Sequence, residues 1–163
     1  MRYIIFAIAL LLSIPVHAET EVAFSPHGGA TQLVVKVIDS AQSQVLLSAY
    51  QLTSPPIAEA LVRAKARGVD VRVVCDRSQR VDWSMCGPLG RAGVPVRING
   101  RYKIAHDKIT VVDQKTVETG SFNYTASAEG YNAENVIVLW NEPAVAAQYA
   151  RHWSVLWNGG ESY

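Results

Sequence analysis

The chain has 163 residues, 49% of them hydrophobic and 18% charged, and its formal net charge is +1 with histidine neutral. This length supports one domain with its own core, and no repeat, linker or low-complexity tract divides the sequence. The balanced charge excludes a protein that attracts a polyanion through its overall charge, so any such attraction must be local.

The first 18 residues have the pattern of a secretory signal peptide. Met1-Arg2 is a short positive region, residues 3–14 are almost all apolar, and Val16-His17-Ala18 ends in the small residues that a signal peptidase recognises. The apolar stretch is shorter than the roughly 20 residues of a membrane-spanning helix. We therefore predict cleavage after Ala18, with an uncleaved anchor as the alternative. The mature domain, 19–163, is then periplasmic or secreted and not stably inserted in a membrane.

Strands and helices alternate through the first part of this domain. The hydrophobic pattern predicts a helix over 30–41 and a second helix from the cap Ser54 and Pro55 to a stop at Gly68. The link at 81–93 is poorly determined by its pattern and leaves room for a short helix. Short apolar runs predict strands at 21–24, 45–50, 69–75 and 94–98.

A hairpin dominates the rest of the chain. β-Branched residues alternate with polar ones on both sides of a tight connection near Gln114-Lys115. A short helical stretch at 126–129 and a strand at 135–140 follow, and Asn141 is expected to cap a last helix that ends at Gly159-Gly160. This order predicts a single α/β domain with a mixed β-sheet flanked by helices on both faces.

The predicted hairpin brings four polar side chains to one face. His106 and Lys108 are two residues apart, so in a strand they point the same way. A two-residue loop at Gln114-Lys115 places Lys108 opposite Ser121 and His106 opposite Asn123. A neutral imidazole can attack phosphorus, while a lysine and neutral donors hold the phosphate oxygens. The cluster predicts a phosphodiester site; the alternative is an ordinary exposed hairpin with solvated His and Lys.

The motif His-x-Lys-x4-Asp from His106 to Asp113, with Gly120-Ser121-x-Asn123 and Glu134-Asn135 after it, resembles the phospholipase D superfamily. Within that superfamily the chain is most similar to the short, single-motif bacterial endonucleases of the Nuc type. The resemblance extends from Phe24 to Asn158. It implies the mixed-sheet fold and a phosphodiester hydrolase that works through a covalent phosphohistidine without a metal or other cofactor. The sequence has no carboxylate cluster suited to Mg²⁺.

The resemblance also implies a role for each polar residue of the motif. His106 resembles the nucleophile, and Glu134 resembles the carboxylate that bonds the other ring nitrogen and fixes the tautomer. The residues that resemble the phosphate ligands are Lys108, Ser121 and Asn123.

Three further residues have structural interpretations. Asp113 lies at the predicted turn, about 15–20 Å along the strand from His106 and Lys108 at ~3.3 Å per residue, so we predict that it closes the turn. Cys75 and Cys86 are the only thiols, and an exported protein meets oxidising conditions. They form either a disulfide or, for Cys75, a small apolar contact in a buried strand. A zinc site is not expected.

After the leader is removed, only three histidines remain. Two-step chemistry needs one imidazole to attack and another acid to protonate the departing oxygen. The family resemblance implies a homodimer whose sites meet at a two-fold axis, so that His106 of each subunit serves its mate. We expect His152 on a packed helix face, and His27, in a Gly-rich loop, as a weaker candidate for substrate contact.

A basic strip lies next to the motif, and Asp107 is the only acid within it. The strip suits nucleic acid or an anionic head group. We predict a non-specific endonuclease for DNA, with RNA as a further substrate left open. The alternatives are a phospholipase D acting on phospholipid head groups, and a non-catalytic DNA-binding accessory of DNA uptake or transfer. The cations of the strip are Arg91, Arg97, Arg101, Lys103 and Lys108.

Overall fold

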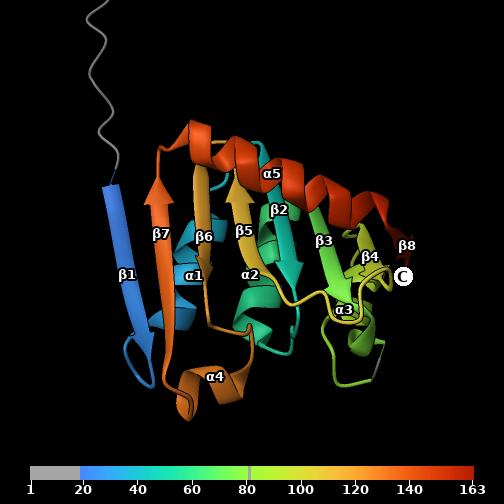
Figure 1. Ribbon diagram of the computed structural model, residues 1–163, viewed down its shortest axis with the longest axis horizontal. Helices are drawn as coiled ribbons and strands as arrows, with labels where there is room; N and C mark the ends of the chain where they lie inside the picture. Colours follow the sequence, from blue (N-terminus) through green and yellow to red (C-terminus); the bar gives the residue numbers. More distant parts are fainter. Residues whose placement is uncertain (1–18, 81) are drawn as a thin grey trace, which may run out of the picture.

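The computed structural model describes residues 19–80 and 82–163, so the predicted leader at 1–18 lies outside the described residues. Within them, eight strands form one sheet in the order β1-β7-β6-β5-β2-β3-β4-β8 (Figure 1). The neighbours β2, β3 and β4 are parallel, and the other neighbouring pairs are antiparallel. The strands are β1 (Glu19–Ser25), β2 (Gln44–Ala49), β3 (Asp70–Asp76), β4 (Val96–Asn99), β5 (Lys108–Val112), β6 (Thr116–Gly120), β7 (Glu134–Trp140) and β8 (Gly160–Ser162).

Helices cover both faces of this sheet, which confirms the predicted fold class (Figure 1). One face carries α1 (Ala30–Asp39), α2 (Pro55–Ala66) and the short α3 (Cys86–Arg91), and α5 (Pro143–Asn158) crosses the other face. Two short segments complete the fold, the 3-10 turn η1 (Arg77–Gln79) and α4 (Ala126–Gly130). The short helix left open within 81–93 is α3.

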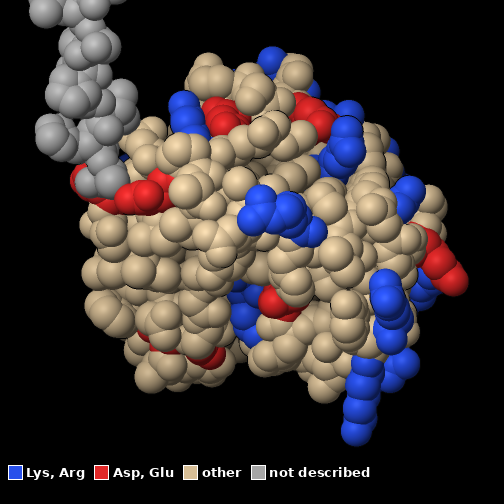
Figure 2. All heavy atoms as spheres, turned by 45° about the horizontal axis from the view of Figure 1, so that its top comes forward, with Lys and Arg blue, Asp and Glu red and all other residues tan. Residues whose placement is uncertain are grey.

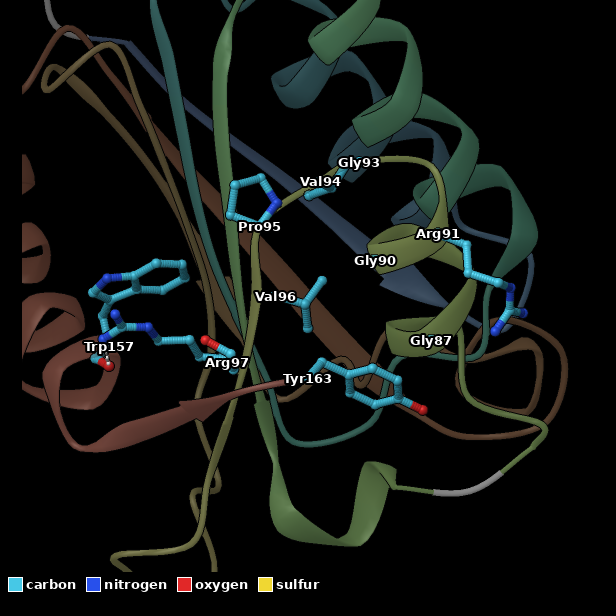
Figure 3. Close-up of a pocket in the computed structure, with 11 residues that line it drawn as sticks. Gly87, Gly90, Arg91, Gly93, Val94, Pro95, Val96, Arg97, Trp157 and Tyr163 are labelled. Carbon is cyan, nitrogen blue, oxygen red and sulfur yellow. Dashed lines mark hydrogen bonds between the residues drawn. The ribbon is translucent and has the colours of Figure 1, made fainter.

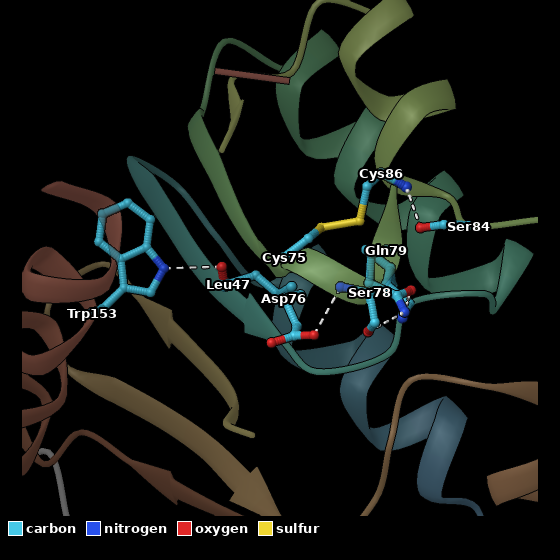
Figure 4. Close-up of a disulfide and its surroundings, with 9 residues drawn as sticks. Leu47, Cys75, Asp76, Ser78, Gln79, Ser84, Cys86 and Trp153 are labelled. Atoms are coloured by element: carbon cyan, nitrogen blue, oxygen red, sulfur yellow. Dashed lines mark hydrogen bonds between the residues drawn. A yellow bond between two sulfur atoms is a disulfide. The ribbon is translucent and has the colours of Figure 1, made fainter. Parts of the chain in front are cut away.

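Two apolar layers hold the sheet between the helices. Leu47 of β2 belongs to the cluster under α1 and α2, whereas its neighbour Leu46 belongs to the cluster under α5. Trp153 of α5 is 2% exposed and donates its indole N–H to the Leu47 carbonyl at 2.9 Å (Figure 4). Because both faces of β5 are covered, every residue of this strand is buried. The strand that begins with Lys108 is therefore a rigid support.

The register of the β5–β6 hairpin differs by one residue from the predicted register. Ile109 pairs with Thr119, and the connection between the strands has three residues instead of two. The pairs expected from the shorter loop, Lys108 with Ser121 and His106 with Asn123, are therefore wrong.

The turn itself accounts for this shift. Asp113 and Gln114 both have positive φ, 51° and 55°, and the backbone N–H of Lys115 donates to the Val112 carbonyl at 3.1 Å. These two residues form a tight turn of the kind that matches strand twist. Because Thr116, not Lys115, pairs with Val112, one extra residue enters the connection.

The last helix begins and ends close to its predicted limits, but its cap is different. Glu142, not Asn141, occupies the N-cap position, and its side chain makes no capping hydrogen bond. Asn141 instead has a positive φ of 55° in the turn after β7. The chain turns back at Gly159 and Gly160 into β8, which pairs with β4 and was not predicted.

Cys75 and Cys86 form a disulfide between the end of β3 and the start of α3 (Figure 4). Both residues are fully buried, so the bond fixes the intervening loop against the core. Disulfides persist in oxidising compartments, and this one indicates an extracytoplasmic location. In the part of the chain that the structure describes, no helix has the length and apolar character to cross a membrane.

Candidate active site

His106, Lys108, Ser121 and Glu134 lie at one edge of the sheet, which is the lower edge in Figure 1. There β2, β3 and β6 end, and β5 and β7 begin. Lys108 is the first residue of β5 and is 6% exposed, whereas His106 lies exposed in the irregular segment just before the strand. Both residues line a hollow of about 330 Å³, together with Asp107, Ile109, Thr119, Gly120, Ser121 and Tyr149.

Hydrogen bonds on both sides fix the backbone around His106. The backbone N–H of Ala105 donates to Asp76 Oδ2 at 2.7 Å, and the carbonyl of Asp107 accepts from the N–H of Tyr50 at 2.9 Å. Asp76 is 2% exposed at the end of β3. Asp76 was not among the residues predicted for the site, although an acid directly after an apolar strand often binds the backbone of a loop. These contacts hold an exposed imidazole in one place, as a nucleophile requires.

The imidazole of His106 contacts both Lys108 and Tyr50, which also lie close to each other. Lys108 Nζ is 3.2 Å from each ring nitrogen and donates to the His106 carbonyl at 2.9 Å. The Tyr50 ring is 4.5 Å from the imidazole, centroid to centroid, and Lys108 Nζ is 5.3 Å from the Tyr50 centroid. The equal distances do not single out one ring nitrogen as the acceptor. A neutral imidazole keeps a lone pair on one of the two, and that lone pair attacks phosphorus.

Burial and two carboxylates act in opposite directions on Lys108. Desolvation lowers the pKa of its amine below the ordinary value, and the charges of Asp107 and Glu134 partly oppose that shift. The partly desolvated ammonium of Lys108 lies close to the imidazole and interacts strongly with any anion that enters the hollow.

Ser121 reaches the site because β6 and β7 approach each other closely at Gly120. A side chain at Gly120 would overlap the carbonyl oxygen of Asn135, so only glycine fits there. The same carbonyl accepts the backbone N–H of Ser121 at 3.1 Å. Ser121 Oγ then donates to Glu134 Oε2 at 2.5 Å. Two of the predicted site residues, Ser121 and Glu134, are thus brought together, although their contact with each other was not predicted.

Glu134 makes different contacts from those that the family resemblance implies. Its two oxygens accept from Ser121 Oγ and, at 3.0 Å, from Asn132 Nδ2. Within residues 19–80 and 82–163 it forms no hydrogen bond with His106. Its role in orienting the imidazole therefore stays a prediction.

Asn123 lies in the loop after β6, between two fully buried aromatic residues, Phe122 and Tyr124. The backbone of Tyr124 donates to Gln51 at 3.1 Å, which ties this loop to the end of β2. Asn123 Oδ1 is buried and has no hydrogen-bond partner among the described residues. Asn123 does not line the hollow, so its role as a phosphate ligand stays a prediction.

Asp113 lies at the other end of the hairpin, away from the hollow. Its carboxylate accepts from the backbone N–H groups of Gln42, Ser43 and Gln44 and from the Ser43 hydroxyl, at 2.8–3.0 Å. Burial raises the pKa of Asp113, but these four hydrogen bonds outweigh that effect and bring it below the ordinary value. The contacts join the turn to the loop between α1 and β2.

Neither His27 nor His152 lines the hollow that contains His106. The side chain of His152 is 51% exposed on α5, and its Nε2 is 3.1 Å from Asp107 Oδ2, so the expectation of a packed face is wrong. His27 has a positive φ of 61° and donates its backbone N–H to Glu129 of α4 at 3.4 Å. Substrate contact by His27 stays a prediction.

A larger hollow, of about 600 Å³, opens between α3, β4 and Tyr163 (Figure 3). Trp157 and Arg97 lie on one side of it, and its lining contains none of the predicted site residues. Among the described residues, no group of three or more His, Cys, Asp or Glu is placed to hold a metal ion. Three of the residues predicted to act in the reaction therefore line the smaller hollow: His106, Lys108 and Ser121.

Known proteins resemble the chain over most of its length. Residues 34–157 match the family model described as "Cardiolipin synthase, PLD-like domain". The "Phospholipase D" of Rickettsia conorii is 38% identical over 137 residues, which cover 83% of this chain and 68% of that protein. The "Mitochondrial cardiolipin hydrolase" of Xenopus laevis is 34% identical over 139 residues, or 85% and 62% of the two chains. The solved structure of Nuc, a phospholipase D family member from Salmonella typhimurium, is 43% identical with a TM-score of 0.87, covering 90% of this chain and 99% of Nuc.

Proposed function

The chain belongs to the PLD-like domain family and is a phosphodiester hydrolase, and we propose that it is a metal-independent endonuclease. Its substrate is DNA, with RNA as a second polynucleotide substrate. The likeness to Nuc extends over nearly the whole of both chains, and the motif resembles the Nuc-type endonucleases. The observation that carries the proposal is the exposed imidazole of His106, with Lys108 Nζ 3.2 Å from its ring and Ser121 in the same hollow.

In the first step, an imidazole nitrogen of His106 attacks the phosphorus of the diester. Lys108 Nζ moves from the ring to a non-bridging oxygen, which frees the lone pair and stabilises the charge that builds on the phosphoryl group. The N–P bond forms as the bond to the leaving oxygen breaks, and that oxygen takes a proton from a general acid. In the second step, water attacks the phosphohistidine, gives its proton to the same group, and His106 leaves.

The general acid is His106 of a second copy of the chain. One motif supplies one imidazole to the hollow, and two-step hydrolysis needs a second group that can hold and return a proton. A two-fold dimer would bring both imidazoles to one phosphate. Phe24, on the edge strand β1, is 59% exposed and pairs with Asn135, next to Glu134. An exposed ring so close to the site suits a contact with the second copy.

A lipid phosphodiester is the second candidate substrate, because the family model and two of the relatives carry names from lipid chemistry. The same imidazole and ammonium would act on its phosphate. The enzyme works in the periplasm or outside the cell, which the disulfide supports, as does the apolar leader at 1–18 of the sequence.

Plasmid cleavage in EDTA tests the proposal. The purified mature protein is expected to nick plasmid DNA in the chelator, and the His106→Ala variant is expected to lose this activity. Gln148→Ala is the control, because it removes an exposed polar side chain of α5 that lies outside the hollow. Release of a head group from phospholipid vesicles with plasmid intact would show a lipase. DNA binding without cleavage would show a binding module.

A native mass measurement tests the dimer. The proposal expects two chains per particle. Exchange of parent subunits into an excess of His106→Ala should abolish the parent's activity, because each mixed dimer then holds one imidazole, whereas separate sites would keep it. A monomer with full activity would contradict the shared site.

A further inference from the structure

A third hollow, of about 490 Å³, lies at the ends of β3 and β4, on the same edge of the sheet as His106. Three arginines from two turns line it: Arg77 and Arg80 follow β3, and Arg101 follows β4. Figure 2 shows that Lys and Arg gather toward the right side of the molecule, where β3 and β4 lie, and are sparse on the left. The other lining residues are Ile98, Gly100, Gly159 and Glu161.

The hollow keeps most of its positive charge. Arg80 pairs with Glu161 at 3.0 Å, but the two side chains are 52% and 85% exposed, so water weakens this contact. Neither Arg77 nor Arg101 forms an ion pair with any carboxylate in residues 19–80 and 82–163. Two guanidinium groups are therefore available to an anion.

Buried side chains fix both turns that carry these arginines. Asp76 Oδ1 accepts the backbone N–H of Ser78 at 2.9 Å and so caps the turn of Arg77. Asn99 accepts the backbone N–H of Arg101 at 3.1 Å, and its own amide donates to the Leu156 carbonyl at 2.7 Å. These hydrogen bonds fix the backbone of both turns that line this hollow. We call it the arginine hollow after Arg77, Arg80 and Arg101.

The same carboxylate connects this hollow to the active site. Asp76 binds the arginine turn through Oδ1 and, through Oδ2, the backbone N–H of Ala105, the residue before His106. Arg77 follows Asp76 and His106 follows Ala105, so at ~3.8 Å per step the two backbones lie at most roughly 15 Å apart. The chain from Arg101 to the active site runs through three exposed residues, Tyr102, Lys103 and Ile104.

We propose that the arginine hollow is a phosphate subsite for a single strand of nucleic acid whose scissile phosphate lies at His106. The inference rests on the proposed nuclease function. A polynucleotide repeats its phosphate along the chain, so it can place one at His106 and another at Arg77 and Arg101. Tyr102 and Ile104, 39% and 49% exposed between the two sites, offer apolar surface to unpaired bases, which paired bases cannot use.

The test compares a polymer with a substrate that has no neighbouring phosphate. The double variant Arg77→Gln/Arg101→Gln is assayed on a single-stranded oligonucleotide of 20 nucleotides and on bis(p-nitrophenyl) phosphate. Lys115→Gln/Arg151→Gln is the matched control, because it removes two exposed cations outside the basic strip and changes the net charge equally. Arg77→Lys/Arg101→Lys keeps the charge and reports on folding.

We expect kcat/KM for the oligonucleotide to fall about tenfold or more in the Gln double variant, and its salt slope to fall by about 0.7 for each lost phosphate contact. The small diester should be cleaved at the parent rate, and the control and Lys variants should keep the salt slope. Equal loss on both substrates, an unchanged oligonucleotide rate, or an equal loss in the control would overturn the subsite. Cleavage of neither substrate by the parent protein would remove the proposed nuclease and the subsite with it.

Two further arms test the nature of the occupant. The parent protein should cleave the single strand about tenfold faster than a duplex of the same sequence, because only unpaired bases can contact Tyr102 and Ile104. Equal rates on the two forms would overturn the single-strand assignment. Binding to vesicles of an anionic diphosphatidyl lipid that falls in the Gln double variant, with oligonucleotide cleavage unchanged, would assign the hollow to a lipid surface instead.

Discussion

The two ends of the β5–β6 hairpin carry polar side chains in opposite states. At the turn, the Asp113 carboxylate accepts four hydrogen bonds from the neighbouring loop. At the open end, the imidazole of His106 is exposed, and Asn123 Oδ1 is buried without a partner among the described residues. Polar groups that the chain itself satisfies stabilise the fold, whereas groups held in place and left open are available to a substrate. The turn end of the hairpin stabilises the fold, and the open end carries the groups that we propose for the reaction.

Replacement of Lys108 by Met should have the largest effect, and only on activity. Loss of one cation that stabilises charge in the transition state typically lowers kcat about 10²- to 10³-fold. The melting temperature should stay level or rise, because burial of an ammonium opposes folding. Steady-state kinetics on an oligonucleotide, with a thermal melt of the same sample, checks both parts. A lower melting temperature with near-normal kcat would make Lys108 a structural residue.

Glu118, in the middle of the same hairpin, should make stability depend on pH. It is fully buried, Tyr124 donates to its Oε2 at 2.8 Å, and burial raises its pKa to about 7, against the opposing effect of hydrogen bonds from Thr110 and Tyr124. The folded state therefore favours the protonated acid. This contribution is fully present below the unfolded pKa near 4.3 and is lost as pH rises through about 7.

Urea unfolding at several pH values measures this effect. Between about pH 4.5 and pH 7.5, the parent should lose about 3 kcal/mol of unfolding free energy that the Glu118→Gln variant does not lose. Parallel curves for the two proteins would mean that Glu118 is already ionised in the fold.

The Asp113→Ala variant should reverse the pattern of Lys108→Met. Four donors lose their acceptor, and alanine tolerates the positive φ poorly, so the unfolding free energy should fall by about 2 kcal/mol. At a temperature where the variant stays folded, its kcat/KM should match the parent. A large loss of activity in fully folded protein would place Asp113 in the reaction and remove the contrast between the two ends.

Asp113 should also support stability only above acid pH. Its folded pKa is lowered, so its contribution is present above the unfolded pKa near 3.9 and is lost as pH falls through the folded value. In Asp113→Asn, the acid side of the stability curve should be flatter than in the parent. Equal steepness would show that other carboxylates determine the acid limit.

The smallest effect is expected from Ser121→Ala. One neutral donor at the rim is worth about 1 kcal/mol, so kcat/KM should fall about fivefold with little change in stability. Ser154→Ala is the control, since that hydroxyl bonds only the Ala150 carbonyl on the exposed side of α5. If both variants behave like the parent, Ser121 does not contact the phosphate, and fewer residues bind the substrate than we propose.

The fold was largely predictable from sequence because periodicity records which faces are buried. The alternation of apolar runs indicated the order of strands and helices, and the position of Asp113 indicated the turn. The hairpin register was not predictable: β5 is buried on both faces, so alternation does not fix it, and neither Asp113 nor Gln114 is a glycine that would reveal positive φ.

The candidate site was predictable in its residue types but not in how it is held. His106 and Lys108 are close in sequence, and their pairing follows from spacing. Asp76 is 29 residues from Ala105, and no local pattern links a carboxylate at the end of one strand to the backbone before another. The arginine turns likewise become one surface only when β3 and β4 lie side by side.

Direct trapping of the enzyme intermediate tests the central claim, that the imidazole of His106 forms a bond to phosphorus. The protein is mixed with an oligonucleotide labelled at its internal phosphates, quenched with alkaline denaturant during turnover, and mapped by peptide. We expect the label on the peptide that contains His106, linked to the imidazole and absent from His106→Ala. Continued turnover with no labelled peptide, or label on another residue, would contradict the account.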